Sequence, residues 1–148
     1  MSTKVRLENA LKDAIRSQDD LRKRTVRMAL SSIRLAEVEK GGPLDEAALL
    51  AALHKEVKSR QETISDARRA GRSDLAAAAE AEITVLESFL PQPLSNEELE
   101  AMARQAVAET GAVSPREMGQ VMKALMPRLQ GRATGDQASQ AVRKLLSG

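Results

Sequence analysis

The sequence contains no cysteine, tryptophan or tyrosine, and Phe89 is its only aromatic residue. The lack of cysteine excludes disulfide bonds, thiol catalysis and thiolate metal sites together. Because β-strands favour aromatic residues, their scarcity argues against a β-sandwich or a β-barrel. Aromatic side chains also stack on unpaired bases, so recognition of single-stranded nucleic acid by stacking is disfavoured.

Long apolar runs are missing as well, because no stretch approaches the roughly 20 apolar residues that a membrane-spanning helix needs. The opening residues are not followed by the apolar core of a signal peptide. We therefore expect a cytoplasmic protein without a membrane partner. The 148 residues, 42% of them hydrophobic, suffice for one typical domain or two small ones.

Apolar residues recur at three- and four-residue steps along the whole chain, which predicts an all-α fold. Capping residues, glycines and prolines mark where each helix begins and ends. In the first part of the chain we predict four helices, ending near residues 18, 39, 70 and 90. Their expected caps are Ser2, Asp19 or Asp20, Asp45, and Ser73 or Asp74.

The dipeptides Leu90-Pro91 and Gln92-Pro93 disfavour helical geometry before each proline and therefore mark a linker. We place the domain boundary there, with an N-terminal four-helix domain over residues 1–92 and a smaller three-helix domain over residues 93–148. Ser95 and Glu98 have the spacing of a capping box, which predicts a fifth helix that ends at Gly111.

The last third predicts a compact helical hairpin. Ser114 and Glu117 have the spacing of a second capping box with Pro115 between them, so a helix is expected to begin at Ser114. Pro127 lacks an N–H, which predicts either a kink or a helix end near Leu125. Beyond it, two glycines can take positive φ and an acidic residue can cap the final helix: Gly131, Gly135 and Asp136.

Charge is unevenly distributed although the formal net charge is only +2. Residues 1–72 carry a net charge of +5, residues 73–111 carry −7 and residues 112–148 carry +4. Two basic segments therefore flank an acidic one. The basic segments suggest contact with nucleic-acid phosphates, whereas the acidic segment 73–111 suggests a surface that contacts another protein.

The densest basic cluster lies in the predicted second helix. At 100° per residue, Lys23, Arg27 and Arg34 fall on one side of this helix. Opposite them we expect a wide buried arc, formed by Leu21, Thr25, Met28, Ala29, Ile33 and Leu35. Two interpretations of the basic side remain open: a ridge that contacts phosphates, or a solvated face paired with carboxylates of a neighbouring helix.

A second group of cations surrounds the C-terminal hairpin: Lys123, Arg128, Arg132, Arg143 and Lys144. These side chains either contact RNA or follow the ordinary preference of cations for helix C-termini. The backbone or the shape of a folded RNA is the expected target, because stacking aromatics are absent. Specificity for DNA is not evident.

Signatures of catalysis are absent from the sequence. His54 is the only histidine, so a second histidine cannot share a metal ion with it. Gly41 and Gly42 end a helix and do not follow a strand, which excludes a glycine-rich phosphate loop there. We expect no catalytic residue, no metal and no cofactor.

Several motifs resemble the GatB/YqeY family over nearly the whole chain. In the last third they are Ser114-Pro115-Arg116-Glu117-Met118-Gly119-Gln120-Val121-Met122, Leu125-Met126-Pro127 and Gly131-Arg132-Ala133. In the first part they are Arg24-Thr25-Val26-Arg27-Met28, Glu37-Val38-Glu39, Gly71-Arg72-Ser73-Asp74-Leu75 and Phe89-Leu90-Pro91-Gln92-Pro93-Leu94. The chain departs from the family pattern at Gln120, where lysine is expected, and at Thr134, where aspartate is expected.

The resemblance implies a stand-alone YqeY-like protein whose C-terminal part is similar to the tail of the B subunit of the tRNA-dependent amidotransferase. In that enzyme the helical tail engages tRNA, while amidation takes place in other domains. The implied partners are tRNA, the tRNA amidotransferase or another protein, and the implied role is accessory to tRNA-dependent amidation. A carbon–nitrogen ligase activity with glutamine as amido donor follows from the family label alone, since no matching active-site residue accompanies it.

Overall fold

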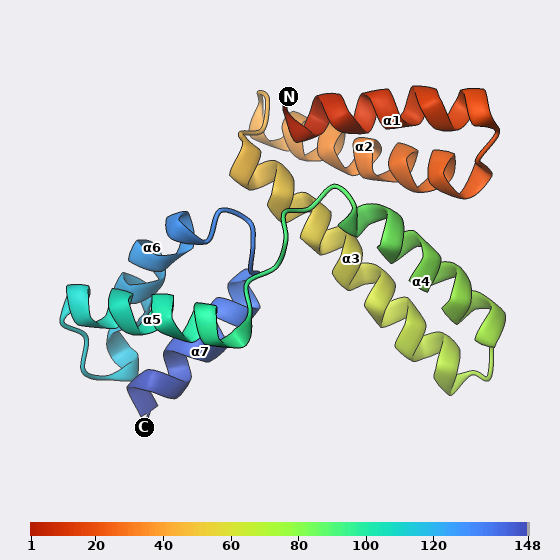
Figure 1. The fold of residues 1–148 in the computed structure, drawn as a ribbon. Coiled ribbons are helices and arrows are strands. Elements are labelled where there is room, and N and C mark those ends of the chain that lie inside the picture. The colour runs from red at the N-terminus through yellow and green to blue at the C-terminus, as the bar shows by residue number, and fades with distance from the viewer. Residues whose placement is uncertain (148) are drawn as a thin grey trace. The chain divides into compact units, whose positions relative to one another are not determined.

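The computed structural model describes residues 1–147. Over these residues it contains seven α-helices, one short 3-10 helix and no strand, so the predicted all-α fold is confirmed. The chain divides into two compact units, Met1–Pro91 and a second unit that begins at Gln92. Four α-helices lie in the first unit and three in the second (Figure 1).

The first unit consists of two helical hairpins (Figure 1). α1 (Thr3–Ser17) packs against α2 (Asp20–Lys40), and α3 (Glu46–Arg69) packs against α4 (Ser73–Glu87). α2 also contacts α3 and α4, which joins the two hairpins. Apolar side chains from all four helices form the core, among them Leu7, Val26, Ile33, Leu53 and Leu86.

Side-chain caps fix the starts of the first three helices, as predicted. Three N-cap side chains accept hydrogen bonds at 2.8 to 3.2 Å from the backbone N–H three residues later: Ser2, Asp19 and Asp45. α2 ends at Gly41, whose φ of 83° lies in the left-handed region that glycine adopts without steric cost.

The start of α4 differs from the prediction. Arg72 occupies the N-cap position and no side chain caps the helix, so the expected cap by Ser73 or Asp74 is wrong. The Arg72 guanidinium instead lies 3.0 Å from the Asp74 carboxylate. This hydrogen-bonded pair holds the pKa of Asp74 below its ordinary value and raises the pKa of Arg72. Asp74 therefore acts through an ion pair and through the helix dipole.

The second unit contains α5 (Asn96–Thr110), the 3-10 helix η1 (Pro115–Glu117), α6 (Met118–Leu129) and α7 (Gly135–Ser147). The three α-helices pack against one another around a separate core that includes Ala103, Val121, Leu125, Ala138 and Val142. At the start of α5 the capping box is present as predicted, and a left-handed Gly111 ends that helix.

The capping box predicted at Ser114 is not formed. The Glu117 N–H donates to the backbone carbonyl of Ser114 at 3.1 Å, and the Ser114 side chain makes no capping hydrogen bond. Because the tighter 3-10 turn already satisfies this N–H, the α-helix begins only at Met118.

α6 continues through Pro127 to Leu129, so the predicted helix end near Leu125 is wrong. Pro127 removes one backbone hydrogen bond. Leu125 and Leu129 are both buried in the core of the second unit, and this packing stabilises the last turn. The helix ends at Gln130, which has a φ of 50°.

The cap of α7 is Thr134, not Asp136 as predicted. The Gln137 N–H donates to Thr134 Oγ1 at 3.1 Å, and the Thr134 N–H donates to Gln137 Oε1 at 2.9 Å. These reciprocal hydrogen bonds make a capping box. Gly135 is the first residue of the helix, and the left-handed glycine of this turn is Gly131 with a φ of 73°.

Candidate nucleic-acid interface

The exposed side of α2 carries the basic ridge. Arg27 and Arg34 are exposed and Lys23 is half-buried, with its Nζ 3.8 Å from Asp20 in the preceding turn. Arg34 lies close enough to Glu37 to contribute to a lowered pKa there, although a hydrogen bond from Lys4 is the largest cause. Within residues 1–147, the Arg27 side chain makes no hydrogen bond or ion pair.

A shallow depression of about 450 Å³ lies on this face of α2. Its lining consists of Lys23, Arg24, Arg27, Met28, Ser31 and Ser32. Two of the predicted site residues therefore share one concave surface, while Arg34 lies outside it. Three cations together with serine hydroxyls suit an oxyanion such as a phosphate group.

The buried side of α2 is rotated from the predicted arc. Met28 and Leu35 were expected to be buried, but they are 48% and 61% exposed. The residues of α2 that are buried are Thr25, Val26, Ala29 and Ile33. α1, α3 and α4 all contact α2, and together they cover the side that contains Val26. Met28 is consequently free to line the depression.

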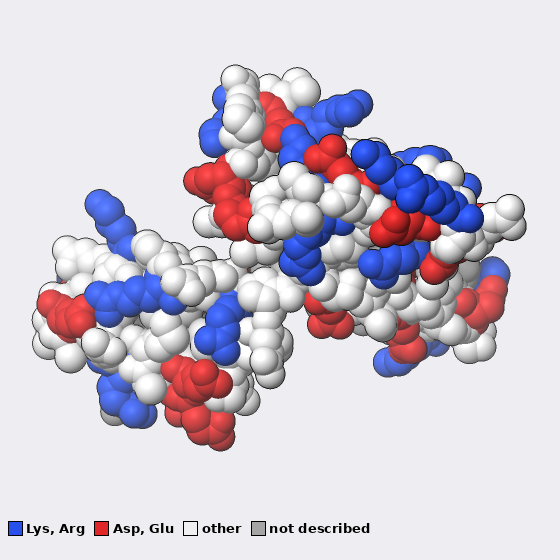
Figure 2. Space-filling view, turned by 45° about the horizontal axis from the view of Figure 1, so that its top comes forward, with Lys and Arg blue, Asp and Glu red and all other residues white. Residues whose placement is uncertain are grey.

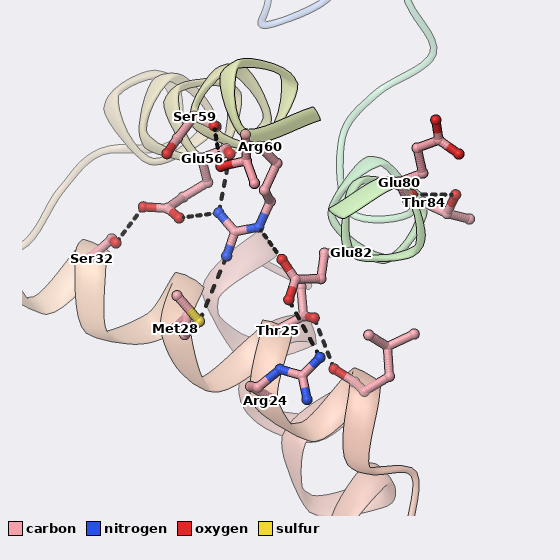
Figure 3. A network of polar contacts seen from close by, with 12 residues as sticks. Arg24, Thr25, Met28, Ser32, Glu56, Ser59, Arg60, Glu80, Glu82 and Thr84 are labelled. Atoms are coloured by element: carbon pink, nitrogen blue, oxygen red, sulfur yellow. Dashed lines mark hydrogen bonds and ion pairs between the residues drawn. The ribbon is translucent and has the colours of Figure 1, made fainter. Parts of the chain in front are cut away.

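A buried guanidinium lies behind the depression (Figure 3). Arg60 on α3 is 6% exposed, and its Nε donates to Glu82 on α4 at 3.0 Å. Its Nη1 donates to Glu56, one turn earlier on α3, at 2.5 Å. One arginine thus pairs with two carboxylates whose side chains are only 17% and 18% exposed.

Three lining residues of the depression are connected to this network. Arg24 lies 3.5 Å from Glu82, and the Ser32 hydroxyl donates to Glu56 at 2.5 Å. The Met28 sulfur lies 3.8 Å from Nη2 of Arg60 itself. The inner wall of the depression is therefore held by Arg60, directly or through one carboxylate.

The sequence interpretation missed Arg60. The spacing along α3 could have identified it, because Arg60 follows the buried Leu53 and Val57 on the same side of the helix. A basic residue in line with an apolar stripe indicates a buried cation that requires acidic partners.

In the second unit, three of the five predicted cations pair with carboxylates of α5. The pairs are Arg128 with Glu109, Arg132 with Glu98 at 3.8 Å and Lys144 with Glu100 at 3.6 Å. The hydrogen bond from Arg128, followed by one from Gln105, lowers the pKa of Glu109. These three cations are therefore already paired within the second unit, and Arg128 and Lys144 also lie in the last turns of α6 and α7.

Lys123 on α6 and Arg143 on α7 differ from those three. Both side chains are exposed, and neither makes a hydrogen bond or ion pair within residues 1–147. They are the predicted tail residues whose charge is available to an outside anion.

The acidic segment 73–111 is largely neutralised by neighbouring cations. Six of its eight carboxylates form ion pairs: Asp74, Glu80, Glu82, Glu98, Glu100 and Glu109. On the face drawn in Figure 2, acidic and basic side chains alternate over each unit and do not separate into two large patches. Most of the negative charge of this segment is therefore paired with a cation of the same unit.

We also searched the described residues for a histidine site, a metal site and a membrane-spanning helix. His54 is half-buried on α3. Within residues 1–147, no three His, Asp or Glu side chains are grouped so that they could hold a metal ion. None of the helices described here combines the length and the apolar character that crossing a membrane requires.

The family model described as Yqey-like protein matches residues 4–146, which include both units. The chain belongs to the YqeY-like protein family. The predicted family membership is thereby confirmed, whereas the likeness of the second unit to the amidotransferase tail stays a prediction.

This YqeY-like chain is also similar to yeast proteins named Altered inheritance of mitochondria protein 41, mitochondrial. The protein of Lachancea thermotolerans is 35% identical over 112 residues, which are 74% of this chain and 60% of that protein. The protein of Kluyveromyces lactis is 33% identical over 113 residues, with the same shares. The match thus spans less than two thirds of these relatives. Their names refer to mitochondria, and the cytoplasmic location expected for this chain stays a prediction.

Proposed function

We propose that this YqeY-like protein binds folded RNA, with tRNA as the preferred ligand, and that the exposed face of α2 makes the main phosphate contacts. The observation that carries this proposal is the depression in which Lys23, Arg24 and Arg27 converge. An RNA phosphate that binds there releases condensed counterions, which is the usual source of nonspecific nucleic-acid affinity.

Arg27 supports the proposal most directly. Because it has no acidic partner within the described residues, it can contact a phosphate without first breaking an ion pair. In the second unit, Lys123 and Arg143 have the same property and supply further phosphate contacts. The resemblance of this unit to a tail that engages tRNA is the reason for preferring tRNA over other folded RNAs.

An accessory role in tRNA-dependent amidation would follow from the same binding. The chain would then hold or present tRNA, and a separate enzyme would carry out the chemistry. The alternative, a protein contact through segment 73–111, is less favoured because most of its carboxylates already have basic partners. Amidation of Glu-tRNA by the isolated chain with glutamine and ATP would replace the accessory role with an enzymatic one.

A gel-shift titration of tRNA at two salt concentrations tests the proposal. We expect binding that weakens steeply as salt rises, and a loss of about tenfold or more in affinity for Arg27→Glu or Arg34→Glu. Arg69→Glu is a matched control, since Arg69 on α3 is exposed but pairs with Asp66 at 2.7 Å. Absence of binding at low salt would contradict the proposal.

A further inference from the structure

Arg60 is buried on α3 and contacts residues of α2, α3 and α4. We propose that Arg60 is a positioning residue for RNA binding: it pairs with both Glu56 and Glu82, offsets one of their two negative charges and thereby keeps the depression on α2 receptive to a phosphate. This inference rests on the proposed function. Arg60 itself contacts no RNA, because its side chain is 7% exposed behind the lining residues.

The first argument concerns charge. Glu56 and Glu82 each hold one lining residue of the depression, Ser32 and Arg24 respectively. Without compensation, two carboxylates at this place would repel the phosphate that the lining cations attract. Arg60 contacts both, at 2.5 and 3.0 Å. Its planar fork of donors can serve two carboxylates at once, which a lysine ammonium does less well.

The second argument concerns Arg24. Its ion pair with Glu82 is long, 3.5 Å, and its side chain is 54% exposed. The contact between Glu82 and Arg60 is shorter, 3.0 Å, and better buried. Arg24 can therefore turn toward a phosphate while Glu82 keeps its main partner. Removal of Arg60 would leave Glu82 dependent on Arg24 and would draw that arginine away from the ligand.

The third argument concerns the shape of the wall. Figure 3 shows Arg60 between Glu56 and Glu82, with Met28 on the α2 side of the guanidinium. The Arg60 guanidinium thus holds Met28 directly, and it holds Ser32 and Arg24 through the carboxylates of Glu56 and Glu82. A loss of Arg60 changes both the charge and the geometry of the lining, so two effects must be separated in the experiment.

Replacing the two carboxylates by neutral amides in the Arg60→Met variant separates the effect of charge from the effect of geometry. Arg60→Met leaves both carboxylates without their main partner, and we expect tRNA affinity in the gel shift to fall by about tenfold or more. The triple variant Arg60→Met, Glu56→Gln, Glu82→Gln removes the excess negative charge, and its affinity should return to within about threefold of the unmodified protein. Circular dichroism spectra and thermal melts establish that each variant is folded.

A single variant that retains Arg60 gives a second test if Arg60→Met does not fold. Glu82→Gln keeps an acceptor for Arg60 but removes one negative charge, so affinity should rise by about twofold to threefold. Glu80→Gln is its matched control on α4, because Glu80 pairs with the exposed Arg68 and not with this network. We expect Glu80→Gln to bind as the unmodified protein does.

The outcomes distinguish the two proposals. If the unmodified protein fails to bind tRNA at low salt, both are overturned. If it binds and folded Arg60→Met binds equally well, the role of Arg60 is overturned and RNA binding stands. Weaker binding by Glu82→Gln, or a triple variant that stays as weak as Arg60→Met, overturns the proposal that Arg60 acts by offsetting the charge of these carboxylates.

Discussion

The Nζ of Lys144 on α7 lies 3.6 Å from Oε1 of Glu100 on α5. The two residues belong to segments that the sequence suggests as separate surfaces, a basic tail and an acidic stretch. In the folded second unit α5 and α7 pack together, so these charges neutralise each other. Arg128 and Glu109 repeat this relationship between α6 and α5. The charge that the second unit can offer to RNA is therefore smaller than its composition implies.

The tail cations should contribute unequally to RNA binding. We expect Lys123→Ala and Arg143→Ala each to weaken tRNA affinity by about threefold, because both side chains are unpaired within residues 1–147. Lys144→Ala should change tRNA affinity little, because the charge of Lys144 is already paired with Glu100. The carboxylate that the substitution frees is exposed to solvent, which screens its charge. Filter binding at fixed low salt measures the three affinities. A larger loss for Lys144→Ala would show that the ion pairs do not decide which cations bind.

The salt dependence of binding should report Arg27 as one phosphate contact. We expect Arg27→Ala to lower the slope of log K against log salt by about 0.7 to 0.9, the contribution of one neutralised phosphate. Affinities measured at four or more salt concentrations give this slope. Arg69→Ala, which removes an exposed cation already paired with Asp66, is the control that should leave the slope unchanged. Equal slopes for Arg27→Ala and the unmodified protein would place Arg27 outside the interface.

Thr134 and Ser114, two of the N-cap positions of the second unit, should contribute differently to its stability. Thr134→Ala removes the side-chain acceptor of the capping box with Gln137, and we expect a loss of about 1 kcal/mol in the free energy of unfolding. Ser114→Ala removes no capping hydrogen bond and should cost much less. Urea denaturation followed by circular dichroism measures both values. Equal losses for the two variants would contradict the caps described here.

Glu37 should make stability depend on pH in acidic solution. A hydrogen bond from Lys4 at 3.1 Å, followed by one from the Leu44 N–H, lowers its pKa in the folded state. A depressed folded pKa stabilises the protein above the unfolded pKa, and this stabilisation is lost as pH falls through the folded value. Glu37→Gln should therefore lower Tm at neutral pH, and its difference from the unmodified protein should shrink in acid.

Thermal melts over a pH series measure this effect. Glu39→Gln is the matched control, because Glu39 is exposed on the same helix and has no partner within residues 1–147. Its melting temperature should follow that of the unmodified protein at every pH. A difference for Glu37→Gln that persists unchanged at low pH would contradict the ion-pair explanation.

Part of the candidate site could be predicted from the sequence. Lys23 and Arg27 share a helix face because the helical repeat places them there, and both line the depression. Arg34 lies on the same exposed face but outside the depression. Arg60 comes from another helix, and it reaches the site only because α2, α3 and α4 pack together. Contacts between helices distant in the chain are not encoded in the spacing of either helix.

The helices and most of their ends follow from the amino-acid sequence. Caps such as Ser2, Asp45 and Ser95 depend on groups within four residues, so local chemistry suffices to place them. Three features depend on how the helices pack: which side of α2 is buried, how far α6 extends past Pro127, and which cations have acidic partners. Burial and ion pairing depend on neighbours contributed by remote segments, and these neighbours exist only once the helices have packed.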